Sequence, residues 1–350
     1  MKRLFAFSAA IAMVATFTVS AMAGEWSFYG SARMRTFSYD VSKEATGTGF
    51  DDQDVDWSLQ GNSRFGASVK NGDVSGRFEA GTGVNLRLLY GTWNFGAGEL
   101  LVGQDYTPTD FTYSNQVVMS DYCLNGYGTL FSRKPMVQLT MGGLKLALVT
   151  QNTGDADGLA GADYDTTLPK VEVRYDRSFA SFSAAVFGGY QQYDIVTAAD
   201  KGYDLTSNVV GIGAKVSLGA AFVAGGIFYG QNLTVYDISA TDTGSDSTAD
   251  YNAASDTIKD NTGYGYHVVF GFEFSDMLGI EVGYGAVTYE DDTTGVKEDE
   301  ASAYYVQVPI TLADSVYIIP EGGKFDYQKN GAGTDEGDLT YFGAKWQINF

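Results

Sequence analysis

The feature that most limits how this chain can fold is a two-residue alternation of apolar and polar residues that recurs throughout the sequence. It is clearest in the last stretch, Asp338–Phe350, where every second residue from Phe342 onward is apolar. Successive side chains of a β-strand point to opposite faces, so this pattern predicts a strand with one apolar and one polar face. The apolar face can pack on a second sheet in a soluble protein, or against lipid in a transmembrane barrel.

The same alternation recurs in sixteen segments, which we predict to be β-strands. They are 26–35, 55–70, 74–80, 84–95, 99–106, 133–142, 144–152, 169–179, 181–193, 207–218, 220–236, 263–275, 277–289, 302–312, 315–328 and 339–350. Short turns such as Asn71-Gly72 alternate with long acidic loops. Outer-membrane barrels have this arrangement, with short turns at one end and long loops at the other. The predicted fold class is therefore all-β, a 16-stranded antiparallel transmembrane β-barrel.

The two faces of the predicted strands differ in charge. Val171 and Val173 share one parity of their strand, and Lys170 and Glu172 share the other. A charge that faces lipid at mid-depth costs about 2–4 kcal/mol. The uncharged parity is therefore predicted to face lipid, and the charged parity to face water. Glu321 lies in a stretch whose parity is ambiguous, and it is not assigned to a face.

Residues 1–23 do not share the alternation and read as a secretory signal peptide. Two basic residues precede an apolar run over 4–19, and the small residues Ala21-Met22-Ala23 then provide a cleavage site. The run is too short for a helix that spans a membrane. We predict a signal peptide over 1–23 and a single barrel domain over 24–350.

Charge and cysteine content narrow the function classes. The formal net charge of −21 at pH 7 argues against nucleic acid as a partner. Cys123 is the only cysteine, so no intramolecular disulfide can hold this exported chain together. A closed ladder of backbone hydrogen bonds would supply that stability instead.

The leader, the sixteen alternating segments and the terminal strand YFGAKWQINF together resemble the general porins of Gram-negative outer membranes. The segments LLVGQDYTP and GYGTLFSRKPMVQLT are most similar to the homotrimeric porins of sulfate-reducing bacteria. The resemblance implies a water-filled outer-membrane channel for passive diffusion of small hydrophilic solutes and ions, with no cofactor. It also implies a homotrimer in contact with outer-membrane lipid and lipopolysaccharide, and Phe350 as the terminal aromatic residue that the barrel assembly machinery recognises.

In this family the third outer loop folds into the barrel and narrows it. The corresponding connection is Thr107–Ser132, which is aromatic and has little net charge, unlike the other long loops. A loop packed on an inner wall needs such residues, whereas a solvated loop does not. The alternative is a hydrophobic cap at a subunit contact or at the barrel mouth. The Pro-Glu-Phe-Gly-Gly element of enteric porins is missing from this loop.

The resemblance further implies that acidic residues of this loop oppose a basic cluster on the wall. The basic candidates are Arg33, Arg35, Arg64, Arg77, Arg87 and Arg133, and the acidic candidates are Asp105, Asp110 and Asp121. Our hypothesis is a transverse field across the constriction that orients polar solutes. Alternatively, several arginines pair with wall acids such as Glu79 and only set the pore width.

The wall near 74–95 bears on the oligomeric state. Arg87 shares its parity with Leu89 and Trp93, so both faces of this wall are expected to be partly apolar, as in a subunit contact. The second loop, Gly81–Val84, is too short to latch onto a neighbouring subunit. A trimer would therefore depend on wall packing.

Other functions have weaker support. The acidic stretches 237–261 and 290–300 read as solvated loops, although weak divalent-ion bridging to lipopolysaccharide is an alternative, and neither has EF-hand spacing. His267, the only histidine, is expected to line the pore, and no Gly-x-Ser-x-Gly elbow accompanies it, so we predict no enzyme and no metal site. A channel selective for anions or oligosaccharides, and a plugged structural or adhesive barrel, remain alternatives that single-channel conductance would separate.

Overall fold

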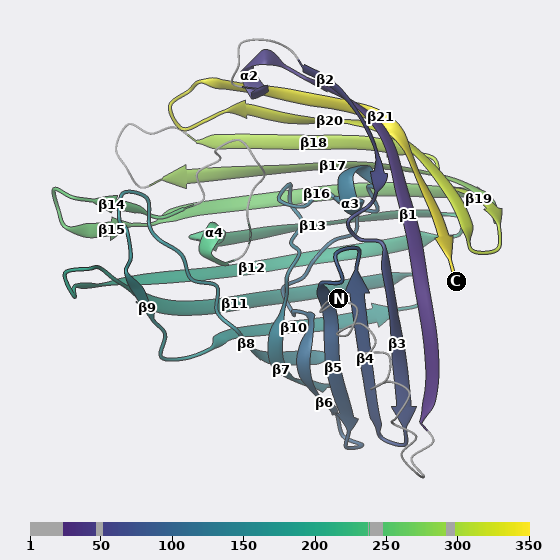
Figure 1. Ribbon diagram of the computed structural model, residues 1–350, viewed down its shortest axis with the longest axis horizontal. Helices are drawn as coiled ribbons and strands as arrows, with labels where there is room; N and C mark the ends of the chain where they lie inside the picture. The colour runs from purple at the N-terminus through teal and green to yellow at the C-terminus, as the bar shows by residue number, and fades with distance from the viewer. Residues whose placement is uncertain (1–23, 47–51, 237, 239–247, 292–297) are drawn as a thin grey trace, which may run out of the picture.

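The computed structural model describes residues 24–46, 52–236, 238, 248–291 and 298–350 (Figure 1). The signal peptide predicted at 1–23 and parts of both acidic stretches lie outside the described residues. Within those described, sixteen strands form one closed antiparallel barrel, so the predicted 16-stranded architecture is confirmed.

Two of the sixteen wall strands are interrupted once, between β2 and β3 and between β18 and β19. The wall elements are β1 (Glu25–Val41), β2 (Asp52–Leu59), β3 (Arg64–Asn71), β4 (Val74–Gly81), β5 (Leu86–Asn94), β6 (Glu99–Tyr106), β7 (Arg133–Met141), β8 (Leu144–Val149), β10 (Lys170–Phe179), β11 (Phe182–Val196), β12 (Gly202–Leu218), β13 (Ala221–Gln231), β16 (Asn261–Ser275), β17 (Leu278–Asp291), β18 (Asp299–Gln307), β19 (Ile310–Ala313), β20 (Val316–Lys329) and β21 (Asp335–Asn349).

The connections carry the remaining elements. They are the one-turn helices α2 (Lys43–Thr46), α3 (Val118–Asp121) and α4 (Leu233–Tyr236), and the short strands β9 (Asp163–Asp165), β14 (Asp250–Asn252) and β15 (Thr257–Lys259). In the described part of the chain, no helix has the length and apolar content needed to cross a membrane.

The sheet closes where β1 meets β21, the purple and yellow strands of Figure 1. The register pairs 31–41 with 339–349. Just beyond it, the N–H of Phe350 donates to the carbonyl oxygen of Gly30 at 3.0 Å. The last residue of the chain thus belongs to the ladder that joins the first and last strands, whose edges an open sheet would leave free.

Large apolar side chains cover the outside of the barrel. Val171 and Val173 are 40% and 41% exposed. Lys170 and Glu172, which alternate with them along β10, are 0% exposed. The parity predicted to face lipid is therefore the exposed one. A continuous apolar exterior is stable against hydrocarbon and not against water, so this barrel is built to span a membrane.

Two phenylalanines of β16 test this lipid-facing row. Phe270 lies in the middle of the row, and Phe274 lies beside the turn that ends the strand. We expect Phe270→Arg to lower the free energy of unfolding by about 2–4 kcal/mol and Phe274→Arg by about 0–1 kcal/mol, because the cost of a lipid-facing charge falls toward the interface. Urea unfolding in lipid vesicles measures both, and equal losses at the two positions would contradict a lipid-facing row.

The strand predicted at 55–70 is interrupted midway, because polar side chains there make other contacts. Both halves, β2 and β3, pair with β1. The side-chain amide of Gln60 donates to the carbonyl oxygen of Val117 at 2.9 Å. The hydroxyl of Ser63 donates to the carbonyl oxygen of Arg33 at 3.0 Å. The interruption therefore turns polar groups toward the segment between β6 and β7.

A β-bulge in β5 corrects the predicted parity of this strand. The register of β4 with β5 shifts by one residue at Arg87. Arg87 consequently turns inward and is 8% exposed, whereas Leu89 and Trp93 point outward and are each 53% exposed. One extra residue reverses the parity of every residue that follows. The expectation that Arg87 shares a face with Leu89 and Trp93 is therefore wrong, and the support that it gave to a subunit contact is lost.

Candidate functional site

The segment between β6 and β7, Thr107–Ser132, contacts buried side chains of wall strands that are distant in sequence. Three glutamates bind it: Glu172 on β10, Glu281 on β17 and Glu321 on β20. All three belong to the buried parity of the wall. Glu172 accepts hydrogen bonds from both the N–H and the hydroxyl of Thr109, at 3.1 and 3.0 Å.

The other two glutamates accept the main-chain N–H groups of the middle of this segment. Asn115 donates to Glu281 from its N–H at 2.9 Å and from its side-chain amide at 2.7 Å. The N–H groups of Val117 and Val118 donate to Glu321 at 2.7 and 2.9 Å. A buried N–H without an acceptor is costly, so these carboxylates stabilise the path of the chain. Sequence parity had left Glu321 unassigned, and its role could not be seen from the pattern.

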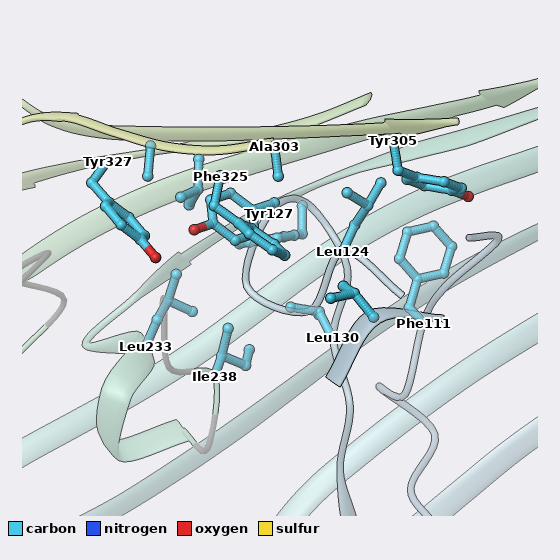
Figure 2. Close-up of a cluster of buried hydrophobic side chains, with 14 of the residues drawn as sticks. Phe111, Leu124, Tyr127, Leu130, Leu233, Ile238, Ala303, Tyr305, Phe325 and Tyr327 are labelled. Atoms are coloured by element: carbon cyan, nitrogen blue, oxygen red, sulfur yellow. The ribbon is translucent and has the colours of Figure 1, made fainter. Parts of the chain in front are cut away.

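A hydrophobic core packs between this segment and the inner side of the wall (Figure 2). Its buried members are Phe37, Phe111, Val117, Val118, Leu124, Tyr127, Leu130, Phe187, Val209, Phe228, Leu233, Tyr236, Ile238, Val287, Tyr289, Ala301, Ala303, Tyr305, Phe325, Tyr327 and Tyr341. The Phe111 ring centroid is 4.8 Å from that of Phe187, and the Tyr127 centroid is 5.5 Å from that of Phe325. Close-packed side chains of this kind exclude water. The core therefore occupies much of the interior beside β11–β21. A cavity of about 530 Å³, with Lys215, Glu273 and Glu281 in its lining, remains there toward the short turns.

A second segment, around α4, also packs on the inner wall. It corrects the strand predicted at 220–236, because β13 ends at Gln231 and Leu233–Tyr236 form a helical turn. The hydroxyl of Tyr236 donates to Glu172 at 3.1 Å, and the ammonium of Lys170 donates to the carbonyl oxygen of Tyr236 at 3.3 Å. Lys170 and Glu172 form an ion pair at 3.2 Å, with both side chains 0% exposed. Leu233 joins the hydrophobic core (Figure 2). The short apolar run of this segment is what extended the predicted strand beyond the observed end of β13.

Two polar cavities lie on the other side of the lumen, along β1 and β3–β8. The first has a volume of about 850 Å³, lies toward the short turns, and includes Ser27, Ser68, Arg77, Tyr90, Asp105 and Lys145 in its lining. The second has a volume of about 700 Å³, lies beside the Thr107–Ser132 segment, and includes Arg64, Arg87, Tyr106, Asp121, Cys123 and Arg133. The first lining is mainly polar, and the second combines charged side chains with a similar amount of apolar surface, in contrast to the core.

Three arginines converge on Glu79 between these cavities. The Glu79 carboxylate accepts Nε of Arg87 at 2.8 Å, Nη2 of Arg77 at 3.1 Å and Nη1 of Arg64 at 3.5 Å, and its side chain is 1% exposed. Arg77 lines the first cavity, and Arg64 and Arg87 line the second. The structure therefore brings three of the six predicted basic residues together, around the wall acid named in the alternative interpretation.

Asp121 lies at the seam of the barrel, where it contacts residues of β1 and β21. It forms ion pairs with Arg33 and with the ammonium of Lys345, the latter at 2.9 Å. The side-chain amide of Asn62 donates to the same carboxylate at 2.7 Å. Two cations thus balance this acidic charge, which weakens any field it exerts across the lumen. Lys345 belongs to the polar row of the terminal strand but was not among the predicted site residues.

The remaining basic candidates are separate from the Glu79 cluster. Arg35 pairs with Asp56 at 2.5 Å and lies outside the linings of both cavities. The Arg133 guanidinium lies over the Tyr106 ring at 5.6 Å from its centroid. Across the described ranges, Arg133 has no carboxylate within ion-pair distance.

The two other acidic candidates occupy different environments. Asp105 lines the first cavity together with Arg77. Asp110 lines neither cavity, and its carboxylate accepts the N–H of Ser132 at 3.1 Å. Burial raises the pKa of Asp110 to about 7, so it is partly protonated near neutral pH. Its contribution to a transverse field is correspondingly small.

The Thr107–Ser132 segment covers His267 and contains Cys123. His267 is 3% exposed beneath Phe111 and Tyr113, and its Nδ1 lies 2.6 Å from the carbonyl oxygen of Gly128. The expectation that His267 lines the pore is wrong, because this segment lies over it. Burial raises the pKa of the Cys123 thiol, which keeps this thiol protonated. Within the described residues, no group of histidine, cysteine and carboxylate side chains could hold a metal ion.

Comparisons with known proteins agree with this architecture. No protein-family model and no curated protein sequence matches the chain. Among solved structures, the outer-membrane channel DcaP of Acinetobacter baumannii superimposes with a TM-score of 0.72 at 16% identity, over 95% of this chain and 99% of that one. An anion-selective porin from Comamonas acidovorans gives 0.61 at 12% identity, over 93% and 100%. OmpF of Salmonella typhi gives 0.59 at 13% identity, over 94% and 99%.

At these identities the likeness is one of fold. It extends over almost the whole length of each chain, so the barrel as a unit is shared with outer-membrane channels and porins. It does not transfer a solute preference or an oligomeric state to this chain.

Proposed function

We propose that the protein is a porin of the Gram-negative outer membrane, a channel through which small hydrophilic solutes and ions diffuse passively. The observation that supports this most strongly is the contrast between an apolar exterior and two polar cavities inside one closed barrel. Water and polar solutes have a favourable environment along these cavities, whereas the outer face requires hydrocarbon. No cofactor or energy source is needed for such a function.

The proposed passage is off-axis. The hydrophobic core occupies much of the interior beside β11–β21, so the proposed route for solutes follows the wall formed by β1 and β3–β8, where the cavities of about 850 and 700 Å³ lie. The Thr107–Ser132 segment acts as the inward-folded third loop, because wall glutamates bind its main chain and its apolar side chains form much of the core. The proposed constriction of the route is the Glu79 cluster, because its arginines line both cavities.

A preference for anions is the second function that a specific observation favours. Arg64, Arg77 and Arg87 share the single carboxylate of Glu79, and Arg133 lines the second cavity without a carboxylate partner in the described residues. The lining of the second cavity therefore has more basic than acidic side chains, with Arg64, Arg87 and Arg133 against Asp121. Such an excess of positive charge attracts anions and repels cations. The Comamonas porin of the same fold is itself anion-selective.

Neutralising two of these arginines tests the proposal. We expect Arg77→Gln combined with Arg133→Gln to lower the anion-to-cation permeability ratio at least about threefold, because two unit charges leave the lining of the passage. Arg177→Gln is the matched control, since Arg177 lies on the outward parity of β10 near the short turns. The reversal potential in a salt gradient across a planar bilayer measures the ratio. Equal values for the double variant and the control would contradict a basic constriction.

Several further properties belong to this proposal. Residues 1–23 are a signal peptide, and 24–350 are one barrel domain. Phe350 is the terminal residue read by the barrel assembly machinery, and its backbone pairing with Gly30 supports a role in closing the barrel. The chain has no catalytic role, in keeping with the burial of its lone histidine, His267.

The proposed assembly is a homotrimer in outer-membrane lipid, with lipopolysaccharide around its outer loops. The short connection between β4 and β5 supports contacts through the wall instead of a latching loop. The resemblance of LLVGQDYTP and GYGTLFSRKPMVQLT supports membership of the subgroup found in sulfate-reducing bacteria.

A further inference from the structure

Glu79 differs from the other carboxylates that face the polar side of the lumen. Its side chain is 1% exposed, yet three guanidinium groups reach it from β3, β4 and β5. Its oxygens have different partners: Arg87 and Arg64 bind Oε1, and Arg77 binds Oε2. Charge-assisted hydrogen bonds of this kind are stronger and more directional than neutral ones. Glu79 is thus the one anchor that the three arginines share. Arg64 has a further hydrogen bond to the carbonyl oxygen of Asn62 at 3.2 Å, and Arg87 has one to the hydroxyl of Tyr106 at 3.3 Å.

Tyr29 on β1 completes the arrangement. Its hydroxyl donates to Oε2 of Glu79 at 3.0 Å and accepts Nε of Arg77 at 2.8 Å. The Arg77 guanidinium also lies over the Tyr29 ring, 5.0 Å from its centroid. Arg77 is therefore held at two points, although its side chain is 37% exposed to the first cavity. Without these contacts, three like charges on neighbouring strands would repel one another.

We propose that Glu79 is the positioning residue of the channel: its buried carboxylate holds the three arginines against the wall and so sets both the open width of the passage and its anion preference. This inference rests on the proposed channel function. Two interpretations of the basic cluster, pairing with a wall acid and a charge-based preference for anions, are then compatible. The paired carboxylate orders the arginines, and their remaining positive charge gives the preference. One carboxylate is enough to order three arginines but leaves a net positive charge in the passage.

Two variants separate the position of the arginines from their net charge. In Glu79→Gln the carboxylate charge is lost, so we expect an about fivefold rise in the anion-to-cation permeability ratio, the effect of one unit charge at contact distance in water. We also expect the single-channel conductance to fall by about half, because the released guanidinium groups extend into the passage. Glu79→Asp keeps the negative charge, but its side chain is one methylene group shorter and cannot contact all three arginines. Conductance should then fall while the permeability ratio changes less than twofold.

Glu300→Gln is the matched control, because Glu300 lies on the outward parity of β18 and in neither cavity lining. It removes the same charge away from the passage, so we expect the permeability ratio and the conductance to stay as in the wild type. Single-channel recording and reversal potentials in planar bilayers provide both readouts. If Glu79→Asp behaves as the wild type and Glu79→Gln raises the permeability ratio without lowering the conductance, then Glu79 acts only as a charge and the inference is wrong.

The outcome also distinguishes the inference from the function on which it rests. A wild-type protein that inserts but shows no conductance steps would overturn the proposed function itself. A conducting wild type with unaffected Glu79 variants would overturn only the positioning role. Heat-modifiable mobility in detergent gels shows whether each variant assembles. If Glu79→Gln does not assemble, Glu79→Asp still tests the inference.

Discussion

Replacing Lys170 by Met is expected to lower the free energy of unfolding by about 3–5 kcal/mol, one of the two largest effects we predict. Lys170 and Glu172 form their ion pair at 3.2 Å with both side chains 0% exposed. Removal of the ammonium leaves a buried carboxylate without its counter-charge, beneath the segment that contains Tyr236. Urea unfolding in vesicles, followed by intrinsic tryptophan fluorescence, measures the loss.

Two further variants identify the cause. Lys145→Met removes an exposed ion pair, that of Lys145 with Asp176 at 3.9 Å, and is expected to cost about 0–1 kcal/mol. The double variant Lys170→Met with Glu172→Gln removes the unpaired charge but keeps an oxygen that can accept the Thr109 N–H, so it should recover most of the lost stability. A double variant no more stable than Lys170→Met would show that the loss does not come from the unpaired carboxylate.

The second large effect concerns Phe111, whose ring packs on a part of the wall where glycines leave the backbone uncovered. Cβ atoms added at Gly213 and Gly226 would lie only 2.2 and 2.1 Å from its Cζ atom, so the ring rests directly on two paired glycines. We expect Phe111→Ala to lower the free energy of unfolding by about 3–5 kcal/mol, because it leaves a cavity at the base of the hydrophobic core.

The control for this prediction is Leu168→Ala, since Leu168 is 71% exposed in an outer loop and should contribute less than about 0.5 kcal/mol. The same urea unfolding experiment compares the two variants. A Phe111→Ala protein as stable as the control would mean that the Thr107–Ser132 segment does not pack on the wall. The core would then be no barrier to water, and the passage need not be off-axis.

The barrel itself was predictable because a transmembrane sheet imposes its chemistry on every second residue. The parity of Val171 and Lys170 follows directly from the cost of charge in hydrocarbon, and the predicted ends of most strands lie within a few residues of those observed. Parity counting failed at Arg87, where the bulge inserts one residue into the count. It also gave no sign that the second strand breaks midway at Gln60.

The lumen was less predictable, because contacts there join residues far apart in sequence. The six arginines were identified as a class, and Glu79 was named as a partner only in the alternative interpretation. The sequence did not indicate that Arg64, Arg77 and Arg87 share Glu79, or that Arg35 pairs with Asp56. Glu321 and Lys345 lie in strands whose local pattern does not mark them. The packing of the segment around α4 depends on its fit to the inner wall, a property of the closed barrel that no local pattern encodes.

The most direct test of an off-axis aqueous passage uses two cysteine variants in a Cys123→Ser background. Ser75 lines the first cavity, whereas Ser207 is buried on the core side, where its hydroxyl donates to the carbonyl oxygen of Asn232 at 2.9 Å. A charged methanethiosulfonate reagent should reduce the bilayer current of Ser75→Cys and leave that of Ser207→Cys unchanged. Block at position 207 without block at position 75, or no current from either protein, would contradict the account.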